Sequence, residues 1–123
     1  MSRHILIAED ESLVAMLLED VLTDAGYRVT VAGDGEKALA AWGECRADMV
    51  VTDVRMPRMG GVELARRLRE QDPALPVLFM TGWADCRAQM ENLVAGARCR
   101  TAVLEKPACL PDIERAVTRL LAH

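Results

Sequence analysis

The chain has 123 residues, of which 51% are hydrophobic and 28% are charged, and these values are typical of one globular domain rather than a disordered segment. Aromatic residues make up only 3%, so aliphatic side chains and methionine must fill the core. The net charge of -4 argues against a nucleic-acid-binding surface, which needs a basic field, and no apolar run is long enough to cross a membrane.

Five short apolar segments follow one another along the chain, and each has the length of a strand. We expect strands at residues Ile5–Ala8, Arg28–Ala32, Met49–Thr52, Val77–Met80 and Ala102–Leu104. The segments between them carry helical patterns. Alternation of strand and helix with short connections predicts an α/β fold, a parallel sheet with helices on both faces, in one domain over residues 1–123.

The first expected helix ends at Gly26, and its inward face is predicted to hold Val14, Leu17, Leu18, Val21 and Leu22. Asp34 is expected to cap the second helix, and the third begins after Gly61. A fourth helix is expected around residues 84–95. The fifth has Pro111 in its first turn, where a missing N–H costs nothing.

The cysteines, at positions 45, 86, 99 and 109, form no C-x-x-C pair and have no histidine at metal-binding spacing. The first residues also lack the layout of a signal peptide. We therefore expect reduced thiols and a cytoplasmic protein.

Polar residues follow four of the five expected strands. They are Glu9 and Asp10 after the first, Asp53 after the third, Thr81 after the fourth and Lys106 after the fifth. Ligand sites of open parallel sheets form beyond the carboxyl ends of the strands, so one pocket is expected to hold all five residues.

Three carboxylates in one pocket repel one another unless they are protonated, paired or bridged by a cation, and oxygen ligands favour Mg²⁺. With a lysine and a hydroxyl beside them, the site suits phosphoryl transfer, with Asp53 as the nucleophile and the Thr81 hydroxyl as a donor to a phosphoryl oxygen. Taken singly, each residue would be interpreted as a turn former or a helix cap. Together they favour a shared site.

Four segments, "ILIAEDE", "VVTDVRMPRMGG", "VLFMTG" and "VLEKP", resemble the receiver domain of two-component response regulators along the whole chain. The resemblance implies a doubly wound (βα)₅ flavodoxin-like sandwich of the chemotaxis-Y-like kind, with a five-stranded parallel sheet of order 2-1-3-4-5. It also implies a phosphoacceptor that catalyses its own phosphotransfer and autodephosphorylation, rather than an enzyme with an external substrate.

The resemblance also implies roles for the site residues. Asp53 looks like the phosphoacceptor, which receives its phosphoryl group from a sensor histidine kinase or a histidine phosphotransfer protein. Asp10 looks like a direct Mg²⁺ ligand, Glu9 an acid that holds the ion through water, and the Arg55 carbonyl a further ligand. Thr81 and Lys106 would form the switch pair, with a cis bond between Lys106 and Pro107.

Some positions depart from the family pattern. Val103 replaces the usual aromatic residue, so a rotating aromatic ring cannot report phosphorylation. Gly60 replaces an acid or amide, and we expect the next glycine, Gly61, to have positive φ. Arg55 and Trp83 occupy positions that tune reaction rates in the family.

Four functions stay open at this point. A stand-alone receiver that signals through protein contacts leads, because no output domain follows His123. A receiver from a hybrid histidine kinase is equally compatible with the sequence. A phosphatase of the haloacid dehalogenase type would need a second acid two residues after the nucleophile, where Arg55 stands. A pseudo-receiver is disfavoured by the intact acids, hydroxyl and lysine.

Overall fold

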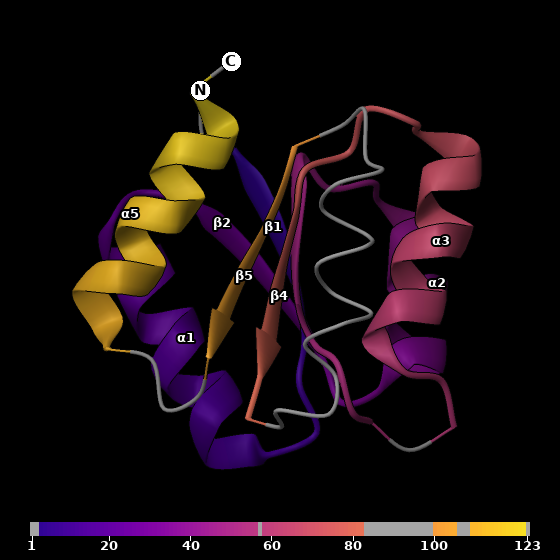
Figure 1. The fold of residues 1–123 in the computed structure, drawn as a ribbon, viewed down its shortest axis with the longest axis horizontal. Coiled ribbons are helices and arrows are strands. Elements are labelled where there is room, and N and C mark those ends of the chain that lie inside the picture. Colours follow the sequence, from indigo (N-terminus) through magenta and orange to yellow (C-terminus); the bar gives the residue numbers. More distant parts are fainter. Residues whose placement is uncertain (1–2, 57, 83–99, 106–108, 123) are drawn as a thin grey trace.

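Five parallel strands form one sheet in the computed structural model, which describes residues 3–56, 58–82, 100–105 and 109–122 (Figure 1). The strands are β1 (His4–Ala8), β2 (Arg28–Ala32), β3 (Met49–Asp53), β4 (Val77–Thr81) and β5 (Thr101–Glu105). Their order, β2-β1-β3-β4-β5, confirms the predicted fold class and strand order. β3 and β4 each extend one residue beyond their expected ends, so Asp53 and Thr81 are the last residues of their strands.

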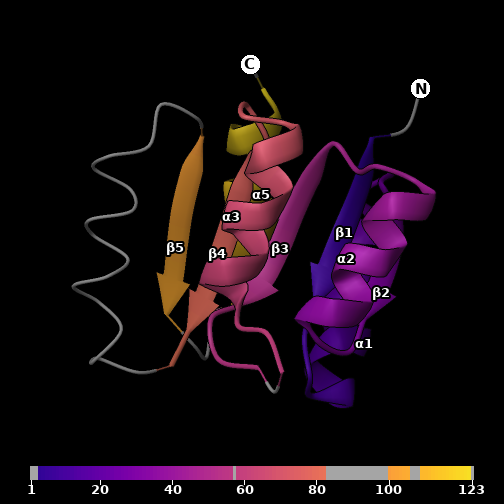
Figure 2. The same ribbon diagram turned by 90° about the vertical axis from the view of Figure 1, so that its right-hand side faces the viewer.

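Helices cover both faces of the sheet, as the alternation predicts. They are α1 (Ser12–Asp24), α2 (Gly35–Glu44), α3 (Gly61–Gln71) and α5 (Leu110–Leu121). Figures 1 and 2 show α1 and α5 on one face and α2 and α3 on the other. The helix expected around residues 84–95 lies outside the described residues. No helix in the described ranges has the length and apolar character that a membrane span requires.

Alternate residues of each central strand enter two different cores. In β1, Ile5 and Ile7 pack with α1 and α5, whereas Leu6 and Ala8 pack with α2 and α3. Both faces of β1 are therefore dry, which explains why its sequence is continuously apolar instead of alternating with polar residues.

Two local predictions about helix ends are confirmed. Gly26 has φ of 100°, its N–H donates to the Thr23 carbonyl, and the Tyr27 N–H donates to the Leu22 carbonyl, so a glycine closes α1 as expected. Asp34 caps α2, since its side chain accepts a hydrogen bond from the Lys37 N–H at 2.8 Å.

The prediction that Leu17 lies on the buried face of α1 is wrong, because this residue is 46% exposed. The buried residues of α1 are Ala15, Leu18 and Leu22. Leu13 and Met16 are also exposed, at 68% and 55%. The apolar stripe of α1 is thus wider than the part that the sheet covers, and sequence periodicity does not show where the covered part ends.

Candidate functional site

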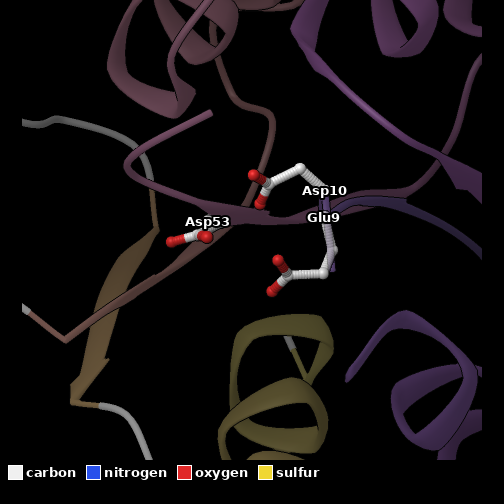
Figure 3. Close-up of side chains that lie close together, drawn as sticks. All are labelled: Glu9, Asp10 and Asp53. Carbon is white, nitrogen blue, oxygen red and sulfur yellow. The ribbon is translucent and has the colours of Figure 1, made fainter. Parts of the chain in front are cut away.

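Three acidic side chains gather at the carboxyl ends of two neighbouring strands (Figure 3). Glu9 and Asp10 follow β1, and Asp53 ends β3. β1 and β3 are adjacent and parallel, with Ala8 opposite Thr52, so the residues that follow Ala8 come beside Asp53. A carboxylate oxygen from each of the three acids lies within 4.8 Å of the others.

The three acids differ in how they are held. Glu9 is only 3% exposed, and its Oε2 accepts a hydrogen bond from the Glu11 N–H at 3.2 Å. The Glu9 N–H donates in turn to the Ala32 carbonyl at 3.0 Å, which ties this residue to the end of β2. Asp10 is exposed and Asp53 is half-buried. Glu9 is therefore fixed and buried by the fold, while Asp10 and, in part, Asp53 are exposed to solvent.

The ligand atoms at the site suit a hard cation. All three clustered groups are carboxylates, and their negative charges repel one another at this spacing. A shallow depression beside them is lined by Asp10, Val54, Arg55, Met56 and Gly60, so residues of the loop after β3 lie at the same place. Carboxylate and carbonyl oxygens are the ligands that Mg²⁺ prefers, so the residues present fit this ion.

Thr81 lies at the same edge of the sheet. It is the last residue of β4, is 4% exposed, and is paired with Glu105 in β5. The preceding residue, Met80, is paired with Asp53 of β3. Thr81 is therefore one residue beyond the position opposite Asp53. Lys106 comes next after Glu105 but lies outside the described residues, as do the Lys106–Pro107 bond and Trp83.

The expectation of positive φ at Gly61 is wrong. Among the described residues, positive φ occurs at Gly26 and at Arg58, where φ is 71°. Gly61 serves a different purpose, because a Cβ atom there would lie 2.2 Å from the Asp53 carbonyl oxygen. The Gly61 N–H donates to the Val54 carbonyl at 3.0 Å, so the start of α3 closes directly onto the end of β3.

Thr52 is a supporting residue that the sequence analysis missed. It is completely buried, and its Oγ1 donates to the Asp53 carbonyl at 2.9 Å. This bond satisfies a buried hydroxyl and helps to fix the main chain of Asp53. A polar residue inside an otherwise apolar strand was the available signal.

A flavodoxin-like sheet with an acidic cluster at the carboxyl ends of β1 and β3 defines the class of the protein. Comparison with protein families then gives the particular family, since residues 5–118 match the model of the response regulator receiver domain. The chain belongs to this family and is a receiver domain of the two-component response regulator type.

Curated relatives with similar sequences are regulators of this type. The receiver protein CpdR of Brucella abortus is 37% identical over 119 residues, which cover 97% of both chains. The probable transcriptional regulatory protein TcrX of Mycobacterium tuberculosis is 37% identical over 92 residues, or 75% of this chain. The match spans 39% of the length of TcrX.

Solved structures agree with the fold. CheY4, a chemotaxis protein of Vibrio cholerae, is 29% identical with a TM-score of 0.86, covering 98% of this chain and 100% of that one. A putative response regulator from Chloroflexus aurantiacus is 33% identical with a TM-score of 0.87, covering 100% of both chains. The receiver domain of a histidine kinase from Syntrophus aciditrophicus is 31% identical with a TM-score of 0.84, covering 98% of this chain and 91% of that one.

Proposed function

We propose that Asp53 accepts a phosphoryl group from a phosphohistidine of a sensor kinase or a histidine phosphotransfer protein, in a Mg²⁺-dependent reaction. The observation that carries the proposal is the placement of the half-buried Asp53 carboxylate within 4.8 Å of those of Glu9 and Asp10. Residues 1–123 would then act as one phosphoacceptor domain that signals through protein contacts. Two free, exposed thiols in the described ranges, Cys45 and Cys109, suit the reducing cytoplasm where we place it.

Each site residue has a role in this proposal. Asp10, Asp53 and the Arg55 carbonyl would hold Mg²⁺ directly and Glu9 through water, and the ion would offset negative charge on the phosphoryl oxygens. A carboxylate oxygen of Asp53 attacks phosphorus in line, the new O–P bond forms as the P–N bond breaks, and the histidine leaves with its electron pair. Thr81 would donate its hydroxyl to a phosphoryl oxygen, and Lys106 would pair with the same group.

The exposed apolar surface of α1 supports a protein as the phosphoryl donor. Leu13, Met16 and Leu17 are 68%, 55% and 46% exposed, and the helix that carries them begins two residues after Asp10. Neighbouring exposed apolar side chains on a monomer often mark a protein interface. We propose that the phosphodonor protein docks on this part of α1 and presents its histidine to Asp53.

Replacing Leu13 and Leu17 together by serine should slow phosphotransfer from a phosphohistidine protein by about tenfold or more, because apolar contacts with the donor are lost. Uptake from the small donor acetyl phosphate should not change. Rapid-quench kinetics measures both transfer rates, with a phosphohistidine protein that phosphorylates the wild-type chain as the protein donor. Val31→Ser, an exposed apolar residue in β2, is the control and should transfer normally. Equal loss with both donors would mean that the substitutions disturb the site itself.

The proposed function is tested with acetyl phosphate and Mg²⁺, followed by the intact mass of the protein. We expect one added phosphoryl group on the wild-type chain and none on Asp53→Ala or after addition of EDTA. Unmodified wild-type protein would refute the proposal. Release of nitrophenol from p-nitrophenyl phosphate over many turnovers would instead favour a phosphatase with an aspartyl nucleophile, which the exposed Arg55 in place of a second acid disfavours.

The same phosphoacceptor role applies within a hybrid kinase. The similarity to the receiver of the histidine kinase from Syntrophus aciditrophicus favours this second setting. In that setting the donor histidine belongs to the kinase itself, or the phosphoryl group passes onward to a histidine phosphotransfer protein. Incubation of the phosphorylated chain with such a protein tests for onward transfer, since a relay receiver loses its phosphoryl group to it.

A further inference from the structure

We propose that Met59 is a positioning residue for the metal site, because it anchors the loop between β3 and α3 on the amino end of α2. This loop, residues 54–60, carries Arg55, whose carbonyl is the main-chain ligand in the proposed function. The inference therefore rests on that function and adds a mechanical support that lies outside the acidic cluster.

Met59 is in close contact with α2. It is 9% exposed and belongs to the core cluster that also holds Ala38 and Trp42 of α2. A Cβ atom on Gly35 would lie 2.5 Å from the Met59 carbonyl oxygen and 2.7 Å from the Met59 Cβ. The loop and the helix thus approach so closely that no side chain fits between them at Gly35.

The residue before Met59 makes a second connection to the same place. Arg58 Nη1 lies 3.8 Å from an oxygen of Asp34, and the Arg58 backbone has the left-handed φ of 71° that a residue with a side chain seldom adopts. Asp34 is also the residue that caps α2. Two consecutive loop residues, Arg58 and Met59, therefore lie against the N-cap of α2, Asp34, and its first residue, Gly35.

The anchored part of the loop is coupled to the part that reaches the acids. The hydrogen bond from the Gly61 N–H to the Val54 carbonyl joins the two ends of this loop. Arg55 and Gly60 line the same depression as Asp10, and Met56 packs against the cluster that contains Met59. We therefore expect a displacement of Met59 to shift the Arg55 main chain. Loss of a partner that hydrogen-bonds directly to a metal ligand typically lowers metal affinity by about ten- to a hundredfold, and we expect the lower value for the less direct support at Met59.

The experiment compares two buried methionines of one chain. Met59→Ala should weaken Mg²⁺ binding by about tenfold, because the Arg55 carbonyl loses its fixed position. Met49→Ala removes the same atoms from a fully buried site at the amino end of β3, away from the acids, and should leave the Mg²⁺ dissociation constant unchanged. Amide chemical shifts of Asp10 and Asp53, followed by NMR during a Mg²⁺ titration of folded protein, give the constant.

A second pair of variants keeps the test decisive if Met59→Ala does not fold. Gly35→Ala adds one methyl group against Met59 and should also weaken Mg²⁺ binding by about tenfold. Gly43→Ala adds the same group on α2 where nothing lies within 4 Å, and should bind like the wild type. The inference would be overturned if Met59→Ala or Gly35→Ala bound Mg²⁺ with wild-type affinity. It would also be overturned if either control lost as much Mg²⁺ affinity as its test variant. Neither result would affect the proposed function. A wild-type chain that binds no Mg²⁺ would overturn the proposed function as well.

Discussion

Gly61→Ala is expected to destabilise the protein by about 3 kcal/mol, at the upper end of the usual cost of overpacking. The added Cβ would lie 2.2 Å from the Asp53 carbonyl oxygen and 2.9 Å from Thr52 Oγ1. Because one of these atoms is backbone at the end of a central strand, the clash cannot be relieved by rotating a flexible side chain. Either α3 or the end of β3 has to shift. Urea unfolding of the two proteins measures the loss.

The same substitution should also slow phosphorylation of the protein that remains folded. A shift of the Asp53 main chain moves the carboxylate away from in-line attack, and a displacement near 1 Å can cost about a hundredfold in rate. The initial rate with acetyl phosphate and Mg²⁺ checks this on folded protein. Gly43→Ala is the matched control, and without a clash it should stabilise α2 by about 0.5–1 kcal/mol. Wild-type stability and rate in Gly61→Ala would show that the close approach is not needed.

The strands and most helix ends could be predicted from the sequence because their causes are local. A continuously apolar segment such as β1 is typical of a strand buried on both faces, and a glycine after α1 or an aspartate before α2 is a local end signal. The acidic cluster followed from the same pattern. Once the strands are parallel, residues at their carboxyl ends must share one edge of the sheet.

What the sequence did not reveal depends on contacts between distant segments. Gly61 has an ordinary backbone conformation, and its requirement comes from the carbonyl of Asp53 eight residues earlier. Leu17 has the correct spacing for the core, yet it is exposed because the sheet covers a narrower part of α1. Met59 looks like one apolar residue in a loop, and its contact with Gly35 becomes visible only when α2 lies beside α3. Each of these depends on the distance between two packed elements, which periodicity does not contain.

Mg²⁺ is expected to stabilise the wild-type protein against unfolding by about 2.7 kcal/mol at a concentration one hundred times its dissociation constant. The unfolded chain does not hold Glu9, Asp10 and Asp53 together, so the ion binds the folded state and shifts the equilibrium toward it. Asp10→Asn should be slightly more stable than the wild type when Mg²⁺ is absent, because one of three mutually repelling charges is lost. The gain in the free energy of unfolding should be at most about 1 kcal/mol, because Asp10 is exposed. The substitution should also remove most of the stabilisation by Mg²⁺.

Urea unfolding of both proteins in EDTA and in Mg²⁺, with NaCl keeping the ionic strength equal, separates ion binding from general screening. Glu63→Gln on α3 is the control for loss of one negative charge. Hydrogen bonds from Arg66 and then Arg67 lower the pKa of Glu63 to about 2. This carboxylate is therefore paired with two arginines, and it does not belong to the acidic cluster of Glu9, Asp10 and Asp53. Glu63→Gln should therefore keep the full Mg²⁺ effect. If Asp10→Asn were less stable than the wild type in EDTA, a hydrogen bond or cap at Asp10 would outweigh the repulsion. If it also kept the Mg²⁺ effect, Asp10 would not be a ligand of the ion.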